Sequence, residues 1–160
     1  AWKVAEEQNK DMDVFLKAVH RQSRDNARTP LQWDNSEFSG FTTTKPWLDV
    51  NPNYEKINVE IQEDNPGSIL NYYREIKKIR RNNSTLIYGD FLDLEPSNEK
   101  LYIYKRWDQQ KTFIVVLNFS SEKVLCDIND LSSMKLVIVN YKKSVYNSFM
   151  DPWEARVYSR

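Results

Sequence analysis

The chain has 160 residues, in which 23 Lys and Arg are balanced by 23 Asp and Glu, with one His and one Cys. A net charge of zero disfavours a nucleic-acid-binding protein, which would carry an excess of basic residues on at least one stretch. No apolar run approaches the roughly 20 residues that a membrane-spanning helix requires. The lone Cys126 excludes an internal disulfide and fits a reducing compartment, so we expect a cytoplasmic protein.

Residues 1–22 have the apolar spacing of an amphipathic helix. The spacing i, i+3, i+4 and i+7 is followed by Met12, Phe15, Leu16 and Val19. Asp11 stands where it can cap the start of this apolar stripe. His20 lies on the polar side of the helix, where we expect a solvated histidine rather than a metal ligand.

Residues 23–64 sustain neither a helical nor a strand period. They contain three prolines and many Asn and Asp residues, and also five aromatic residues, which are Trp33, Phe38, Phe41, Trp47 and Tyr54. A structureless run of this length is uncommon inside a compact domain unless it is functional or packs on something else. The aromatic residues therefore predict an ordered loop that lies against a larger body.

A second amphipathic helix is predicted from Pro66 to Arg81. Asn65 is a good N-cap, and proline is tolerated at the first helical position. The expected buried face consists of Ile69, Tyr72, Tyr73, Ile76 and Ile79. We expect the basic residues between Arg74 and Arg81 to be solvated or to lie near the favourable C-terminal dipole.

From Leu86 onward the pattern changes to short β runs separated by turn residues. They are residues 86–94, 101–107, 113–119, 124–128, 135–140 and 154–158. The run at 113–119 is almost continuously apolar, as in a strand buried on both faces. Cys126 alternates with apolar neighbours and is predicted to be a small core residue. Many short strands at regular spacing predict an antiparallel β-sandwich.

The predicted order is helix, long aromatic loop, helix and β-sandwich. A sandwich can bury its own core, but two helices separated by a long loop leave their apolar stripes uncovered. We therefore expect a further body, upstream in sequence, against which the first half packs.

Several strings within this order are similar to those of a known family. The loop reads SRDNARTPLQWD over residues 23–34, then GFTT, KPW and VNPNY, and NYYR and YGD follow it in the helix and beyond. These strings, in this order, resemble the oligo-1,6-glucosidases and related α-glucosidases of the α-amylase superfamily. The resemblance covers nearly the whole chain and is weakest in the sandwich.

The resemblance implies a fold and a division of the chain. Residues 1–84 would be the C-terminal remnant of a (β/α)8 catalytic barrel, with a loop and the last helix, and residues 85–160 an antiparallel β-sandwich called domain C. The fold class is thus mainly β with some α. The family hydrolyses α-glucosidic bonds with retention, using an Asp nucleophile, a Glu acid/base and a second Asp, all on earlier barrel strands. No catalytic residue can be placed here, so we expect the isolated chain to be inactive, with no cofactor or metal.

The resemblance also implies a substrate-binding role for one arginine. In the family, the Arg of the string Arg-Thr-Pro, here Arg28, reaches the floor of the glucose pocket and pairs with an upstream carboxylate. A planar guanidinium can hold a carboxylate through two hydrogen bonds, and that acid can accept bonds from sugar hydroxyls. Arg24 and Asp25 are expected to shape the same loop or to contact the sugar.

Two questions stay open at the level of sequence. The rings of Trp33, Phe41 and Trp47 would either anchor the loop on the barrel or stack on sugar rings. The chain as a whole would either complete an α-glucosidase that acts on α-linked gluco-oligosaccharides, with the missing barrel as intramolecular partner, or be a free-standing carbohydrate-binding or structural module. No nucleic acid or membrane is expected as a partner.

Overall fold

A computed structural model of the chain describes residues 2–22, 24–128, 131–141 and 148–160. Contacts within the chain define two compact units, Ala1–Leu70, called unit 1 here, and Asn71–Arg160, called unit 2. In the described ranges, no helix is both long enough and apolar enough to cross a membrane.

Unit 1 begins with two helices, α1 (Trp2–Glu7) and α2 (Met12–Gln22). The helical prediction for this segment is confirmed, but the helix is interrupted between them, where Asn9 has a left-handed φ of 50°. Asp11 caps α2 as expected, because its Oδ1 accepts hydrogen bonds from the amides of Asp13 at 3.0 Å and Val14 at 3.2 Å.

The rest of unit 1 is ordered loop built on short helical turns, which lie at Asp25–Ala27, Glu37–Gly40 and Pro52–Glu55. One element was not predicted, the short helix α3 (Val59–Glu63). Its start is fixed by Asn58, whose side chain accepts from the Ile61 amide at 2.9 Å and donates to the Tyr54 carbonyl at 2.9 Å. Five residues are too few for an apolar period, so only this cap could have revealed the helix.

The second predicted helix is α4 (Ile69–Arg81), and its predicted start at Pro66 is wrong. The Asn65 side chain accepts from the Gly67 amide at 2.9 Å, which makes a local turn, and the helix begins three residues later than expected. Its predicted end is confirmed, since the Asn83 side chain donates to the Ile79 carbonyl at 2.7 Å. The predicted buried face is wrong in part, because Ile69 is 83% exposed, and Tyr73 and Ile76 are also exposed.

The first predicted strand, residues 86–94, is also wrong in its first half. Residues Thr85–Tyr88 form the short helix α5, and the strand β1 covers only Asp90–Asp93. Thr85 and Leu86 are buried in α5, so the apolar run here reflects packing of a helical turn rather than a strand.

Unit 2 otherwise follows the predicted strands. These are β2 (Leu101–Trp107), β3 (Thr112–Asn118), β4 (Val124–Leu125), β5 (Lys135–Val139) and β7 (Ala155–Ser159), together with the unpredicted two-residue β6 (Phe149–Met150). A short 3-10 turn lies at Leu131–Ser133. One antiparallel sheet has the order β1-β2-β3-β7-β5, and a second pairs β4 with β6. The antiparallel sandwich is therefore confirmed.

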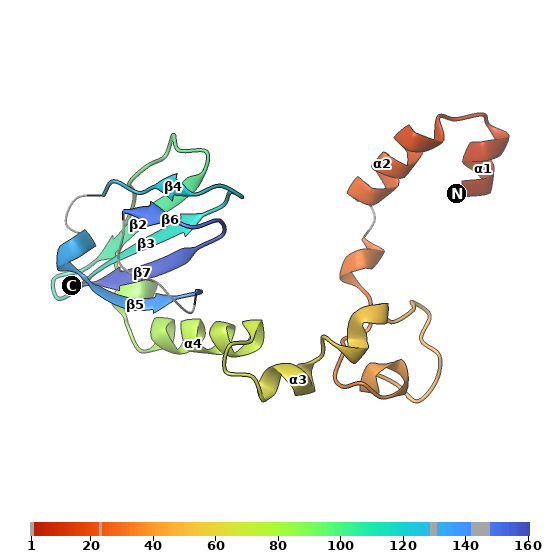
Figure 1. Ribbon diagram of the computed structural model, residues 1–160, viewed down its shortest axis with the longest axis horizontal. Coiled ribbons are helices and arrows are strands. Elements are labelled where there is room, and N and C mark those ends of the chain that lie inside the picture. Colours follow the sequence, from red (N-terminus) through yellow and green to blue (C-terminus); the bar gives the residue numbers. More distant parts are fainter. Residues whose placement is uncertain (1, 23, 129–130, 142–147) are drawn as a thin grey trace. The chain divides into compact units, whose positions relative to one another are not determined.

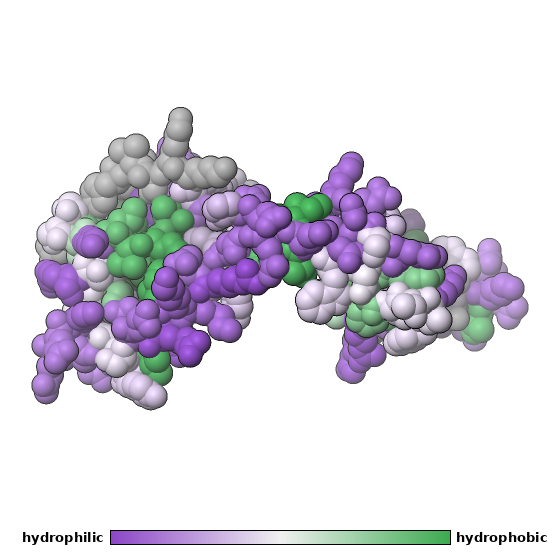
Figure 2. Space-filling model, turned by 90° about the horizontal axis from the view of Figure 1, so that it is seen from below, coloured by the Kyte–Doolittle hydropathy of each residue, from purple (hydrophilic) through white to green (hydrophobic). Residues whose placement is uncertain are grey.

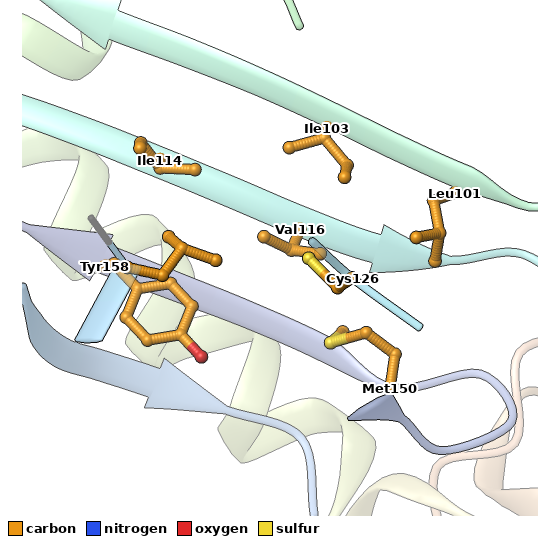
Figure 3. Close-up of a cluster of buried hydrophobic side chains, with 8 residues drawn as sticks. Leu101, Ile103, Ile114, Val116, Cys126, Met150 and Tyr158 are labelled. Carbon is orange, nitrogen blue, oxygen red and sulfur yellow. The ribbon is translucent and has the colours of Figure 1, made fainter. Parts of the chain in front are cut away.

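The apolar core lies between the two sheets. The register sets Ile103 opposite Val116, and Ile114 opposite Tyr158, so that these side chains share the face toward β4 and β6. Figure 3 shows them gathered around Cys126 and Met150. Burial raises the pKa of the Cys126 thiol to about 11, and its prediction as a small core residue is confirmed.

Helix α4 covers the other face of the five-stranded sheet within unit 2 (Figure 1). The cover is incomplete. Figure 2, which views the molecule from this side, shows hydrophobic surface left open on unit 2 beside polar surface. A cavity of about 270 Å³ lies there, between the helix and side chains of β2, β3, β5 and β7.

Candidate functional site

The three predicted site residues lie on one turn of unit 1. The turn Asp25–Ala27 is closed by the Arg28 amide, which donates to the Asp25 carbonyl at 2.9 Å, and by the Ala27 amide, which donates to Arg24 at 3.2 Å. Ser23, the first residue of the string, lies outside the described residues. Two cations and one carboxylate are thus presented within five consecutive positions, residues 24–28.

The side chains of Arg24, Asp25 and Arg28 are all exposed. In the part of the chain that the structure describes, none of them takes part in an ion pair or a side-chain hydrogen bond. The backbone therefore brings the three residues together without pairing them. A guanidinium that has no partner within its own unit keeps all five donors available for a carboxylate or a sugar.

The segment after Arg28 is anchored by backbone hydrogen bonds to α3. The carbonyls of Gln32 and Trp33 accept from the amides of Val59 at 2.9 Å and Glu60 at 3.0 Å, the first donors of that helix. The Gln32 side chain donates to Asn53 Oδ1 at 3.0 Å and to the Ile57 carbonyl. The start of a helix and a loop more than 20 residues upstream thus hold each other in place.

A shallow cleft of about 310 Å³ lies between these two segments. The first residue that lines it, Thr29, follows Arg28 in the sequence. One wall is Thr29–Gln32 and the other is formed by Ile57, Asn58, Val59 and Gln62. Leu31 and Ile57 are about half exposed, at 51% and 53%, so part of the cleft surface is apolar. The cleft offers apolar contact together with the buried Asn58, whose side chain is already hydrogen-bonded to the Tyr54 carbonyl and the Ile61 amide.

A tight turn fixes the next part of the loop. Phe38, Ser39 and Gly40 have φ values of 52°, 55° and 66°, three left-handed residues in succession. The Ser39 carbonyl accepts from the amides of Trp33 at 2.9 Å and Asp34 at 3.3 Å. Such conformations are costly for residues other than glycine, so the surrounding hydrogen bonds must impose them.

Asp34 stands at the centre of this turn. Its Oδ1 accepts from the Ser36 hydroxyl and from the Ser36 amide at 2.8 Å, and these bonds hold the pKa of the carboxyl below its usual range. A Cβ on Gly40 would lie 2.5 Å from Asp34 Oδ2, so a side chain there would have to displace the Asp34 carboxylate at a strained, left-handed φ. This arrangement was not predicted from the sequence, although its Asp-Asn-Ser string is typical of side-chain-capped turns.

The aromatic residues of the loop do not form a core of their own. The exposed fractions of Trp33, Phe41 and Trp47 are 48%, 50% and 83%. Rings left open in this way are available either to a packing partner or to a sugar, and the geometry of unit 1 fits both interpretations.

The described residues hold no group of three or more His, Cys, Asp or Glu side chains arranged as a metal site. His20 is exposed on α2, as predicted. Among the residues in the described ranges, Glu154 is the one buried carboxylate. Its two oxygens accept from Arg156 Nε at 2.7 Å and Nη2 at 2.8 Å, which makes it a structural ion pair.

The chain is similar to known proteins in family, sequence and structure. The family model described as alpha amylase, catalytic domain, matches residues 1–89. The oligo-1,6-glucosidase of Heyndrickxia coagulans is 39% identical over 155 residues, which is 97% of this chain and 28% of that protein. The glucan 1,6-alpha-glucosidase of Streptococcus pneumoniae is 38% identical over 147 residues, 90% of this chain and 27% of its own length.

The similar solved structures include proteins with other names. Isomaltulose synthase from Klebsiella sp. LX3 matches with a TM-score of 0.85 at 32% identity, covering 99% of this chain and 30% of its own. A variant isomaltulose synthase from Erwinia rhapontici NX5, solved with its natural substrate sucrose, gives 0.84 at 36% identity, with coverage of 99% and 30%. The chain spans 28% of the length of the curated relatives named oligo-1,6-glucosidase.

Proposed function

Because this chain belongs to the α-amylase family, we propose that it is the C-terminal part of an α-glucosidase that acts on α-linked gluco-oligosaccharides, as an oligo-1,6-glucosidase does. In this proposal residues 1–84 end the catalytic barrel and residues 85–160 form domain C. The observation that carries the proposal is the similarity of nearly the whole chain to oligo-1,6-glucosidases that are 34% to 39% identical. A cytoplasmic location is part of the same proposal.

Arg28 supplies the substrate contact in this proposal. Its guanidinium holds an acidic side chain from the rest of the barrel, and that acid positions the glucose ring for the two carboxylates of a retaining mechanism. Arg24 and Asp25 shape the same loop or contact the sugar. The exposure of all three side chains, without partners in the described part of unit 1, supports this role.

The rest of the barrel is the proposed intramolecular partner. Large apolar side chains that a globular body would cover are bare here, among them Trp47, Ile69 and Tyr88, which are 83%, 83% and 84% exposed. This chain alone binds and orients but performs no chemistry, so we expect it to be inactive.

Two assays test the proposal. The purified 160-residue chain is incubated with isomaltose, and we expect no release of glucose. In the polypeptide encoded by the complete reading frame, Arg28→Met is expected to lower kcat/KM by roughly ten- to a hundred-fold, the value of a charge-assisted contact. Arg21→Met, which removes an exposed cation from α2, is the matched control and leaves kcat/KM unchanged. Turnover by the chain alone, or equal kinetics of both variants, contradicts the proposal.

An alternative function, a carbohydrate-binding module, has one observation in its favour. Phe91 and Tyr102 flank Tyr104 on one face of the sheet, with ring centroids 5.6 and 5.3 Å apart, and Phe91 is 52% exposed. Isothermal titration of the chain with isomaltotriose tests this function. Heat that saturates in the parent chain but not in Phe91→Ala would favour the module, whereas no saturable heat would exclude it.

A further inference from the structure

The cavity between α4 and the sheet is a second place where a ligand could bind, and it lies outside the loop that carries Arg28. Its volume of about 270 Å³ exceeds the roughly 150 Å³ that is enough to hold a benzene ring. Most of its wall is aliphatic, with Ile79 from the helix and Leu117, Ile138 and Val157 from three strands. A compact apolar group therefore fits the body of the cavity.

Two arginines give one side of this cavity a positive charge. Arg80 donates to the Leu86 carbonyl at 2.6 Å, and Arg106 donates through Nη2 to the carbonyls of Gly89 at 2.7 Å and Ile87 at 3.4 Å. All of these acceptors are uncharged, and no carboxylate is among the residues that line the cavity. The two positive charges therefore lack a counter-ion at this site.

One donor of Arg106 is left without any acceptor. Its Nε is fully buried and has no hydrogen-bond partner within the described chain. A buried donor that is not bonded costs free energy, and this cost is larger for a charged group. Capping of α5 explains the contacts of Arg106 with the carbonyls, but it does not explain the unbonded Nε or the open volume.

The tyrosines of the cavity add neutral polar groups. Burial raises the pKa of Tyr72 and of Tyr104, while Arg106 and Arg80 act on Tyr104 in the opposite direction. Both hydroxyls therefore stay protonated at neutral pH. Tyr104 lines the same cavity as both arginines.

We propose that this cavity binds a small organic monoanion, in which a carboxylate is attached to a compact aromatic or branched aliphatic body. The carboxylate lies at the guanidinium groups of Arg80 and Arg106, and the body displaces water from the aliphatic wall. A charged donor that faces a carboxylate in a partly buried setting gives strong and directional contact. The anion supplies the counter-charge that the residues lining the cavity lack.

The probe is 3-phenylpropionate, and its neutral control is 3-phenylpropanamide, which has the same shape. Isothermal titration of the 160-residue chain is expected to give saturable binding of the acid with a dissociation constant near or below about 1 mM. Binding is expected to weaken as salt is raised, and the amide is expected to bind at least about ten-fold more weakly. Equal binding of acid and amide, or no saturable binding of the acid, overturns the proposal.

Matched variants locate the site. Arg106→Met keeps an apolar stem and removes the charge, so it is expected to weaken binding of the acid at least about ten-fold. Arg81→Met is the control, because it removes an exposed helix charge outside the cavity, and it is expected to leave the affinity within about two-fold of the parent chain. Since Arg106 also caps α5, Ala155→Leu provides a second route, because it fills the cavity without altering either arginine and is expected to abolish binding. Normal binding by Ala155→Leu, or equal weakening by both arginine variants, overturns the assignment.

Self-association through the open apolar surface is tested in the same samples. Sedimentation velocity is expected to show a sedimentation coefficient that does not change with chain concentration when the acid is bound. A concentration-dependent dimer that excludes the acid would identify a second copy of the chain as the occupant and would overturn the proposal.

Discussion

Each of the two units of this chain is stabilised internally by a different kind of interaction. In the described part of the molecule, the buried apolar residues of unit 1 are Ala5 and Pro30, and the rest of the buried hydrophobic side chains belong to unit 2. Unit 1 buries polar residues instead, such as Ser39 and Asn58, which serve as hydrogen-bonding centres for the loop around them. Unit 2 has a core that its own sheets cover, whereas unit 1 is a hydrogen-bonded frame that leaves its large apolar side chains open.

Because of this difference, we expect the two units to differ in how stable each is in isolation. A sandwich with a continuous core meets the main requirement for independent stability, which is the removal of apolar surface from water. A frame of capped turns fixes the backbone precisely enough to present Arg28, but it gains little from burial. The proposed substrate contact thus lies in the unit that depends more on a partner.

The largest effect is expected where unit 2 buries charge. Glu154 and Arg156 are 2% and 3% exposed and are joined by two hydrogen bonds, so Glu154→Gln leaves a buried guanidinium without its counter-charge. We expect unit 2 to lose roughly 3–5 kcal/mol of unfolding free energy in a urea titration followed by circular dichroism. The double variant Glu154→Gln with Arg156→Met is the control, and it should lose less than the single change. A single variant as stable as the parent would mean that the pair does not support the sheet.

Truncating a large apolar side chain is expected to cost much more stability in unit 2 than in unit 1. Ile103 is 1% exposed in the core, and Trp47 is 83% exposed in the loop. Ile103→Ala should cost roughly 2–5 kcal/mol because it leaves a cavity, and Trp47→Ala should change stability by less than about 0.5 kcal/mol. Both values come from the same urea titration. If Trp47→Ala were as costly as Ile103→Ala, unit 1 would have an apolar core of its own, and the two units would not differ in how they are stabilised.

The sequence predicted unit 2 better than unit 1 for the same physical reason. Strands such as β2 and β3 follow from alternation and from a continuous apolar run, because the sheet is held by burial and burial leaves a pattern in the sequence. The error at residues 86–88 arose because a buried helical turn and a buried strand have the same apolar run when they are this short. The late start of α4 arose because Asn65 bonds to a turn amide instead of capping a helix.

The candidate site was predictable in composition but not in shape. The strings placed Arg24, Asp25 and Arg28 in one loop, and the structure puts them on one turn; their roles stay predictions. The left-handed residues at Phe38 and Ser39 could not be foreseen, because single-residue preferences oppose them. They are imposed by hydrogen bonds between segments far apart in sequence, which no local pattern records.

Gly40 tests whether unit 1 is held by its backbone geometry. Gly40→Ala places a Cβ 2.5 Å from Asp34 Oδ2 at a φ of 66°, so we expect a local loss of about 1–2 kcal/mol. Hydrogen exchange should become faster at the amides of Trp33 and Asp34, while Val116 in the sheet keeps its protection. Gly67→Ala, at a position without a left-handed φ, is the control and should leave the loop unchanged. Unchanged exchange in Gly40→Ala would show that the turn tolerates a side chain.

The smallest effect is expected from a single exposed carboxyl in the same turn. The Ser36 hydroxyl and amide lower the pKa of Asp34 below its ordinary value of 3.8, so the ionised form is favoured in the folded loop. A carboxyl with a lowered folded pKa stabilises the loop above the ordinary value, and this contribution is lost as the pH falls through the lowered one. Because Asp34 is only partly buried, we expect a shift of its midpoint rather than unfolding of the chain.

A carbon-detected NMR titration measures the midpoint of Asp34 directly. In Ser36→Ala the hydroxyl donor is gone, so the midpoint should move up toward 3.8, while the signals of unit 2 follow the same pH course as in the parent chain. Identical midpoints in the two proteins would mean that Ser36 does not hold the carboxylate. The turn would then be maintained by its backbone hydrogen bonds alone. Unit 1 would still differ from the buried core of unit 2, but through its main-chain geometry and not through side-chain acceptors.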